Sequence, residues 1–408
     1  MGKPDTYGPG TLGLTLLLAG LSALGPLSTD MYLASLPALQ REFVVDAAMV
    51  QLTLSVFLAG FALAMPVYGP LADRYGRLPV LRVGLVLFGI GTVACALAPT
   101  IEVLIAARMF QAIGACAGPV IARAIVRDLQ ASLPGGPAGA ARLYSHIASA
   151  MAVAPAVAPI IGSQLQAGFG WRSTFWTLAL LAVLGIVFVH RRLAETLARP
   201  DPQATDPARI LAAAASIVGH AGWRANVLVC SFAYAGLFAF ISGSAFVLIG
   251  HYGVAESAFG FYFLLVVIGF ISGAQASGRL NGRLQIHTIL RLGASIALVS
   301  GLAMAAIAWL VPHWGPLAVV LAMACYMAGG GMVLPQAQAG ALSPFPDRAA
   351  TASALLGLTQ MTLAALAGVV MAHFYGGGPE AMATTIALCG VAAAGTAWFV
   401  LRRPHGGH

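Results

Sequence analysis

The chain has 408 residues, of which 59% are hydrophobic and only 8% are charged, and its formal net charge is +8. Soluble domains carry about 25% charged residues, so this composition excludes an ordinary soluble protein and indicates a polytopic membrane protein. The positive charges lie in short clusters between apolar runs, without the basic stripe and interleaved aromatics of a nucleic-acid-binding surface. We therefore expect the lipid bilayer, and no nucleic acid, as a partner.

Apolar runs separated by charged or Gly/Pro-rich breaks predict an all-α chain with twelve transmembrane helices. A short interfacial helix at 210–220 can precede the seventh span. The twelve spans are expected at 11–36, 47–68, 80–97, 103–125, 143–164, 173–189, 227–250, 259–277, 288–311, 316–340, 349–374 and 381–401.

The longest polar segment, near 191–209, divides the spans into two sets of six. We expect an N-terminal bundle at 1–192, a cytoplasmic linker at 193–222 and a C-terminal bundle at 223–408. Gly76-Arg77 after the second span and Gly282-Arg283 after the eighth lie about half the chain apart, as parallel repeats require. Nearly all of the 21 Lys and Arg residues fall on one side if both termini are cytoplasmic, which the positive-inside rule favours.

The five cysteines stand singly inside apolar runs. None has the spacing of a zinc site or a redox pair, so we expect no disulfide, no metal and no cofactor.

One acid lies inside the first span. Asp30 follows Gly25-Pro26, which loosens the helix, and an ionised acid in the membrane costs on the order of 3 kcal/mol or more. Such a residue faces water, a partner or a transport path, whereas the alternative is an acid at headgroup level near the helix end. We interpret Asp30 as a proton carrier.

An arginine within the fourth span needs a cavity or an acidic partner. Arg108 is therefore the candidate partner of Asp30, with a snorkelling or structural arginine as the alternative. Approach and withdrawal of this cation would change how readily Asp30 binds a proton.

Two further segments have unusual composition. A tight, charged turn joins the second and third spans, with Gly69, Asp73, Arg74, Gly76 and Arg77 as its key residues. In the fifth span, Pro155, Pro159 and Gly162 predict a bent helix that packs closely against a neighbour.

These segments resemble motifs of the major facilitator superfamily. Residues 69–81 are similar to its G-x-L-A-D-R-x-G-R-x-x-x-L loop, which there is a hinge and cytoplasmic gate latch. Residues 108–112 are similar to the R-x-x-Q-G motif of proton-coupled members, with Ala112 in place of glycine. Residues 154–163 are similar to the G-P-x-x-G-G stretch of drug antiporters, with Ala158 and Ser163 in place of two glycines.

Together with Ser28-Thr-Asp-Met-Tyr-Leu and the seventh span at 235–246, these motifs resemble the Bcr/CflA family of bacterial drug transporters. The resemblance implies twelve helices in two six-helix bundles with pseudo-two-fold symmetry. It also implies a monomer in the bacterial inner membrane that exports antibiotics such as bicyclomycin, sulfonamides or phenicols in exchange for protons. Ser22 stands where some related exporters carry a second acid, which favours neutral substrates.

Apolar walls with a few polar groups suit lipophilic drugs. Helix packing is the competing explanation for each aromatic residue. The candidate cavity residues are Met31, Tyr32, Gln51, Ser55, Phe57, Phe61, Gln111, Phe232, Phe238, Ser242, Gln336 and Gln360.

Three other function classes remain to be weighed. An importer or a metabolite exporter, for example of amino acids, would have the same fold and similar charges. A membrane-embedded enzyme needs a nucleophile, a His/acid pair or a metal site, and the few membrane acids and histidines are far apart along the chain. A channel would have no reason for the half-chain duplication.

Overall fold

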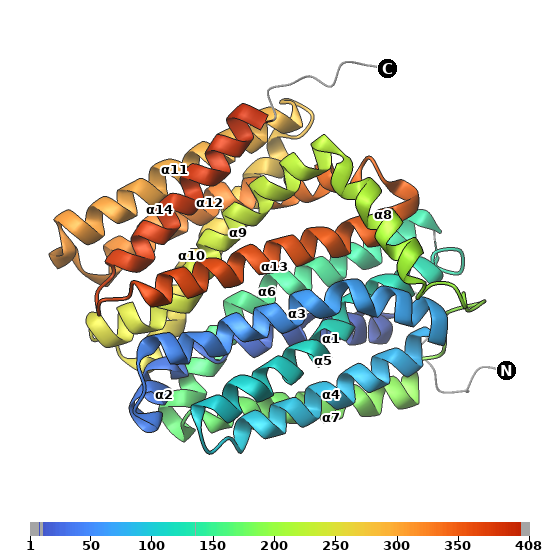
Figure 1. Ribbon diagram of the computed structural model, residues 1–408, viewed down its shortest axis with the longest axis horizontal. Helices are drawn as coiled ribbons and strands as arrows, with labels where there is room; N and C mark the ends of the chain where they lie inside the picture. The colour runs from blue at the N-terminus through green and yellow to red at the C-terminus, as the bar shows by residue number, and fades with distance from the viewer. Residues whose placement is uncertain (1–7, 9–10, 135, 401–408) are drawn as a thin grey trace.

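The computed structural model describes residues 8, 11–134 and 136–400, and its regular elements in this part of the chain are all helical (Figure 1). Eleven helical segments are long and apolar enough to cross a membrane, and α6, with 33 residues, is the twelfth long helix. The long helices are α1 (Leu12–Asp30), α3 (Ala47–Tyr75), α4 (Arg77–Ala96), α5 (Ile101–Asp128), α6 (Pro137–Phe169), α7 (Arg172–Arg192), α9 (Ala221–Ala245), α10 (Phe259–Leu280), α11 (Ile286–Leu310), α12 (Gly315–Leu342), α13 (Ala349–His373) and α14 (Glu380–Gly395).

Most helices extend past the expected spans by a turn or two at their polar ends. Hydropathy marks the segment that can lie in lipid, but a helix continues into water until a cap or glycine ends it. Thus α3 runs on to Tyr75 and ends at Gly76, which has a φ of 97°. The expected short helix also forms, as α8 (Pro207–Gly219), with Asp206 accepting a hydrogen bond at its N-terminus.

The span expected at 11–36 is present within Leu12–Phe43, and its helical path is interrupted near its end. The α1 helix ends at Asp30, and a 3₁₀ turn, η1 (Leu33–Ser35), leads into α2 (Leu36–Phe43). Pro37 lies in the first turn of α2, where its missing N–H costs no hydrogen bond within the helix. The helical path nevertheless continues to Phe43, which places Asp30 within the span Leu12–Phe43 and not at its end.

The two sets of six helices pack by the same scheme. Helix α1 contacts α5, α6 and α7, and α9 contacts α12, α13 and α14 in the equivalent pattern. Helix α4 contacts α5 and α7, as α11 contacts α12 and α14. Gly76 and Gly282, which follow the second helix of each set, both have positive φ. The chain is therefore two six-helix bundles related by a repeat, and this part of the expected fold is confirmed.

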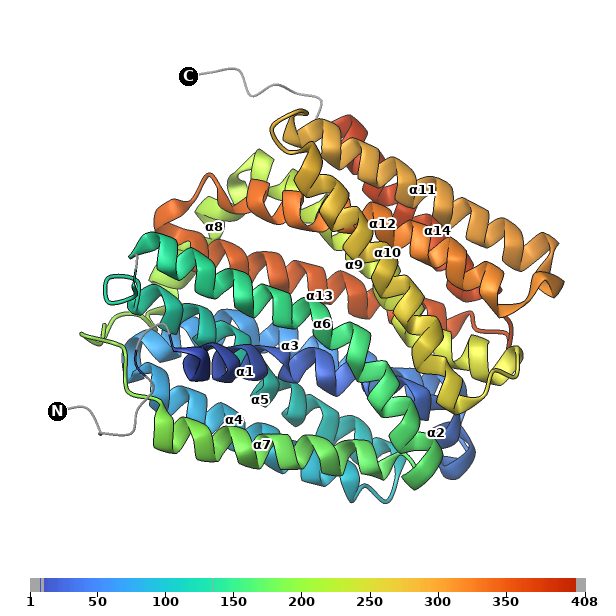
Figure 2. The same cartoon turned by 180° about the vertical axis from the view of Figure 1, so that it is seen from behind.

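The bundles meet along two pairs of helices, α3 with α13 and α6 with α10 (Figures 1 and 2). We call the end near the two chain termini the terminal end and the opposite end, where α2 lies, the far end. At the far end Arg41 forms an ion pair with Glu256 at 3.0 Å, and Gln166 donates to the same carboxylate at 3.2 Å. A Cβ on Gly260 of α10 would stand 2.5 Å from the Cα of Ile160 on α6, so the two backbones nearly touch there.

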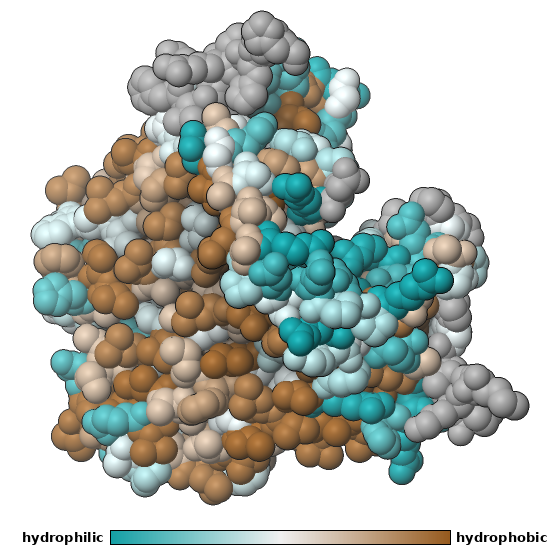
Figure 3. Space-filling view, turned by 45° about the vertical axis from the view of Figure 1, so that its right-hand side comes forward, coloured by the Kyte–Doolittle hydropathy of each residue, from teal (hydrophilic) through white to brown (hydrophobic). Residues whose placement is uncertain are grey.

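The surface agrees with a membrane setting. Figure 3 shows a broad hydrophobic flank, with hydrophilic side chains gathered at the end turned toward the viewer, which is the terminal end. Exposed side chains on the helix walls include Val83 and Leu180, which are 68% and 60% exposed. In water such a surface would be an aggregation liability, but lipid chains cover it without cost.

The packing of α10 against α12 predicts an asymmetry between two glycines of one helix. A Cβ on Gly269 would collide with the carbonyl oxygen of Ala324, whereas one on Gly278 would meet nothing within 4 Å. We expect Gly269→Ala to cost about 1–3 kcal/mol of stability through overpacking. Gly278→Ala should leave stability equal or higher, because alanine favours helix by up to about 1 kcal/mol. Thermal unfolding of the two purified variants measures both, and equal melting temperatures would contradict this packing.

Candidate functional site

Asp30 is buried where the two bundles meet. Its side chain is 4% exposed, and Thr29 donates a hydrogen bond to Oδ1 at 2.9 Å. The η1 turn that follows contacts α9 of the other bundle. The Asp30 carboxyl also interacts electrostatically with Tyr234 of α9. The acid predicted from the sequence therefore lies in the interior, at the seam between the bundles.

Arg108 lies fully buried on α5 and bonds to two neighbouring helices of its bundle. Its Nη1 donates to the carbonyl of Ser28 on α1 at 3.0 Å and to Oε1 of Gln111 at 2.7 Å. Its Nε donates to the carbonyl of Thr53 on α3 at 3.5 Å. The same cation thus links α1, α3 and α5.

Aromatic rings supply the rest of the surroundings of this guanidinium. Its central carbon lies 4.3 Å from the ring centre of Phe57, 4.8 Å from that of Tyr32 and 5.9 Å from that of Phe175. Ring faces attract a cation most strongly when water is excluded. The Nη2 atom is buried with no hydrogen-bond partner among the described residues, so the site retains one free donor.

Asp30 and Arg108 do not form an ion pair in this structure. Arg108 reaches α1 through the backbone carbonyl of Ser28, two residues before the acid, and the ion pairs of the described residues do not include the two side chains. Their functional pairing stays a prediction.

A polar chain extends from Arg108 into α4. Gln111, which accepts from Arg108, donates through Nε2 to the hydroxyl of Thr92 at 3.0 Å. The hydroxyls of Tyr32 and Thr53 pair at 3.1 Å. These contacts fix the side chains of Tyr32 and Gln111, which we had predicted as cavity residues, inside the N-terminal bundle.

A second group of predicted residues gathers at the seam around Gly368 of α13. A Cβ on this glycine would stand 3.1 Å from Oγ of Ser55 on α3, 3.1 Å from the ring of Phe238 on α9 and 3.3 Å from Oγ of Ser242 on α9. Both serine hydroxyls are buried without a hydrogen-bond partner among the described residues. Buried orphan hydroxyls are costly and call for a ligand or water.

Of two more predicted side chains, Gln51 borders this seam and Phe61 has its contacts within the N-terminal bundle. Gln51 of α3 donates to Sδ of Met371 on α13 at 3.8 Å, while its Oε1 is buried and unpartnered. Phe61 stacks on Phe57 at 6.3 Å and lies against Gly25 of α1.

Of the four remaining predicted cavity residues, one follows α1 and the others lie on α9, α12 and α13. Gln336 donates to Ser277 and Asn281 on the last turns of α10, so its amide is engaged within the C-terminal bundle. Phe232 packs against the apolar cluster that contains Trp223 and Val333. The backbone of Met31 lies against Gly162. Gln360 is buried on α13.

The charged turn between α3 and α4 is a compact ionic cluster. Arg77 is 2% exposed, donates to both oxygens of Asp128 at 2.7 and 3.2 Å, and also donates to Asp73. Asp128 is the last residue of α5. Gly69 has open space around it, whereas Gly76 has no room for a side chain beside Glu195.

The segment after α7 is hydrogen-bonded to this turn and to the start of α4. The Glu195 carboxylate accepts from the first backbone N–H groups of α4, those of Arg77 and Leu78, each at 3.0 Å. Partial burial opposes ionisation of Glu195, but these N–H groups and those of Thr196 and Leu197 outweigh it and lower its pKa. Arg74 donates to Thr205 in the same segment.

Pro155, Pro159 and Gly162 lie where α6 meets its neighbours. Gly162 is in backbone contact with Met31, and the Pro159 carbonyl lies 2.8 Å from the Cβ position of Gly260 on α10. The segment predicted to bend α6 is thus part of the contact between the bundles.

Sequence reasoning missed four residues of this arrangement. Asp128 and Glu195 are polar residues near helix ends and carried no motif, and Gly368 and Tyr234 are ordinary residues of apolar spans. The acids could have been suspected as partners for the surplus arginines of the charged turn. Gly368 had no signal, because only the fold brings α3, α9 and α13 together.

Comparisons with known proteins agree with this architecture. The sequence profile of the Major Facilitator Superfamily matches residues 18–369. An uncharacterized MFS-type transporter of Bacillus subtilis is 33% identical over 358 residues, 87% of each chain. A bicyclomycin resistance protein homolog of Haemophilus influenzae is 27% identical over 95% of this chain and 96% of its own. Multidrug resistance protein D of Escherichia coli is 29% identical over 85% of each.

Solved structures share the fold at low sequence identity. A D-xylose–proton symporter superimposes with a TM-score of 0.76 at 15% identity, covering 95% of this chain and 97% of its own. A peptide transporter in complex with sulfate gives a TM-score of 0.73 at 16% identity, covering 97% and 96%.

The hydrogen bonds from the start of α4 to Glu195 predict an acid-sensitive contribution to stability. Because the pKa of Glu195 is lowered in the folded state, its contribution is complete above about pH 4.3, the ordinary value, and is lost as pH falls through the folded pKa. Glu195→Gln should cost about 1 kcal/mol at pH 7, as loss of a helix cap does. The difference in melting temperature from the wild type should shrink as the pH falls below the ordinary value and vanish once the pH is below the lowered, folded-state pKa.

Asp206→Asn is the matched control. Asp206 is an exposed acid of the same segment that caps α8, and asparagine caps equally well. Its melting curve should follow the wild type at every pH. A Glu195→Gln deficit that persists unchanged at acid pH would contradict the role of the carboxylate.

Proposed function

Because the chain belongs to the Major Facilitator Superfamily, we propose that it exports small lipophilic drugs or antibiotics in exchange for protons. The chain is a multi-pass membrane transporter of small molecules and not an enzyme. The substrate class follows the names of its relatives, which include bicyclomycin and multidrug resistance proteins. Bicyclomycin, sulfonamides and phenicols are the first candidates.

The observation that carries the proton-coupling proposal is the position of Asp30. It is a buried acid at the seam between the bundles, beside α9 and two residues from the carbonyl that holds Arg108. A carboxylate at this depth is costly unless it takes up a proton or a cation offsets its charge. A proton that binds Asp30 therefore changes the electrostatics of both bundles at once, which is what an exchange cycle requires.

The substrate would lie at the seam around Gly368. Ser55, Ser242 and Gln51 offer hydrogen-bonding atoms that have no partner among the described residues, and Phe238 offers an apolar wall. A few polar groups on an apolar surface match a small lipophilic drug.

In the proposed cycle the bundles, 1–192 and 223–408, rock about the contacts of α3 with α13 and α6 with α10, joined by the linker 193–222. Both termini face the cytoplasm of the bacterial inner membrane, in accord with the arginine-rich loops at that end. The far end then faces outward. Its ion pair between Arg41 and Glu256 would hold the outer side closed.

Replacement of Asp30 by asparagine tests the proton coupling. In liposomes with an imposed pH gradient, each candidate drug should trigger proton movement with wild type, and Asp30→Asn should reduce it at least about tenfold, because the carrier is gone. Asp46→Asn is the control, since Asp46 is an exposed cap of α3 whose function asparagine retains. Undiminished proton movement in Asp30→Asn would make the acid structural. Drug and proton moving in the same direction would replace antiport with symport.

The orphan hydroxyls at Gly368 predict variants that lose transport without losing stability. Ser55→Ala and Ser242→Ala remove no hydrogen bond of the described fold, so their melting temperatures should hold, while drug affinity falls about three- to tenfold, the effect of one neutral hydrogen bond. Ser231→Ala is the control. Ser231 is equally buried and unpartnered on α9, but lies about 16 Å away along the helix. Equal affinity losses in all three variants would place the substrate elsewhere.

A further inference from the structure

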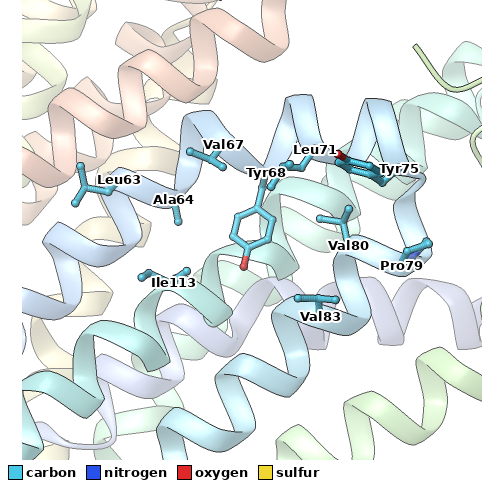
Figure 4. A pocket seen from close by; sticks show the side chains of 10 residues that line it. All are labelled: Leu63, Ala64, Val67, Tyr68, Leu71, Tyr75, Pro79, Val80, Val83 and Ile113. Carbon is cyan, nitrogen blue, oxygen red and sulfur yellow. The ribbon is translucent and has the colours of Figure 1, made fainter. Parts of the chain in front are cut away.

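A long apolar groove lies on the outer wall of the N-terminal bundle, between α3, α4 and α5 (Figure 4). It encloses about 570 Å³. Its rims are exposed, with Leu63 at 62% and Val83 at 68%, while Ala64 and Tyr68 form a buried floor. The Tyr68 ring points into the gap between α3 and α4 (Figure 4). This is a cleft open to the lipid, separate from the seam at Asp30.

The groove follows from how its helices diverge. Helices α3 and α4 are joined at Gly76, but α3 packs against α5 and α13 whereas α4 packs against α5 and α7. The two helices therefore splay apart over α5, and Ile113 of α5 lies at the bottom of the gap (Figure 4).

At the terminal end the groove continues into a smaller hollow with charged residues in its walls. The hollow encloses about 370 Å³ and shares Tyr75 and Pro79 with the groove. Its other walls include Arg82, Glu195 and Leu197. An apolar groove thus ends at a hollow that contains an arginine and a glutamate.

The charge in this hollow is available to an anion. Arg82 lines the hollow, no ion pair of the described residues includes it, and its Nε, which is buried against the protein, has no hydrogen-bond partner among them. The Glu195 carboxylate, which would repel an anion, is already bonded to the backbone N–H groups at the start of α4 and in its own turn. Arg74 lies over the Tyr75 ring at 5.2 Å and adds a second cation beside the groove.

We propose that this groove and hollow together bind an anionic phospholipid from the leaflet at the terminal end. One acyl chain lies between α3 and α4 over Tyr68, and the headgroup phosphate accepts hydrogen bonds from Arg82. The amphipathic shape selects the occupant: a free anion would leave the groove unfilled, and a neutral drug would leave Arg82 unpaired. Basic pockets between transmembrane helices recognise anionic headgroups in this way.

Native mass spectrometry of the purified full chain tests the proposal with phosphatidylglycerol and phosphatidylcholine of identical acyl chains. Wild type should retain phosphatidylglycerol at least about fivefold more strongly, the factor expected for one arginine near an anionic headgroup. Arg82→Gln should abolish this preference, and Arg82→Lys should keep most of it. Arg142→Gln, which removes an exposed arginine of α6 outside both hollows, should behave as wild type.

A groove-filling variant tests the acyl chain separately. Val67 is 50% exposed on the rim, so Val67→Trp should fold while blocking the groove and weakening both lipids. An unchanged lipid preference in Arg82→Gln would overturn the proposal. So would displacement of phosphatidylglycerol by inorganic phosphate alone, which would indicate a free-anion site, or by a candidate drug, which would indicate a drug site.

Discussion

The buried guanidinium of Arg108 is the constraint on which the N-terminal bundle depends. A cation removed from water needs other groups to replace its solvation, and here backbone carbonyls of α1 and α3, the amide of Gln111 and the faces of aromatic rings replace most of it. Through Gln111 the network reaches Thr92 of α4, and through Phe175 it reaches α7. Five of the six helices therefore contribute to one ion's environment, so none of them can shift far without altering it.

That constraint gives the proposed proton site a mechanical connection. Arg108 binds the carbonyl of Ser28 in the last turn of α1, and Asp30 ends that helix just before the 3₁₀ turn that contacts α9. Asp30 lies at the end of α1. Arg108 is hydrogen-bonded to this end of the helix, and the turn that follows it contacts the C-terminal bundle, so a change in the charge of Asp30 acts between the two. A proton can then bias the contact between the bundles without a direct ion pair between the two charged side chains.

Hydropathy and local motifs predicted the helices, their number and the division into two bundles. A helix that crosses lipid needs an apolar run of a set length, and such a run can be read directly from the sequence. They placed Asp30, Arg108 and the charged turn at the right points on those helices. They could not predict the hydrogen bonds of Glu195 to α4 or the cluster at Gly368, since each joins segments more than a hundred residues apart. Gln336 illustrates the limit: its helix is right, but its face turns toward α10 instead of the seam.

The repeat duplicates the fold but not the chemistry. Helix α12 occupies the place of α5 in the C-terminal bundle, yet it has no charged residue, and at Gly329 and Gly331 it packs closely against its neighbours. Gly329 lies against α11 and Gly331 against the Phe270 carbonyl of α10, so close backbone contact takes the place of the buried arginine of α5. The N-terminal bundle has a buried, hydrogen-bonded arginine on α5, whereas α12 of the C-terminal bundle packs through close backbone contacts. The charged network beside the proposed proton site therefore has no counterpart on α12, and the two bundles differ in chemistry at equivalent positions.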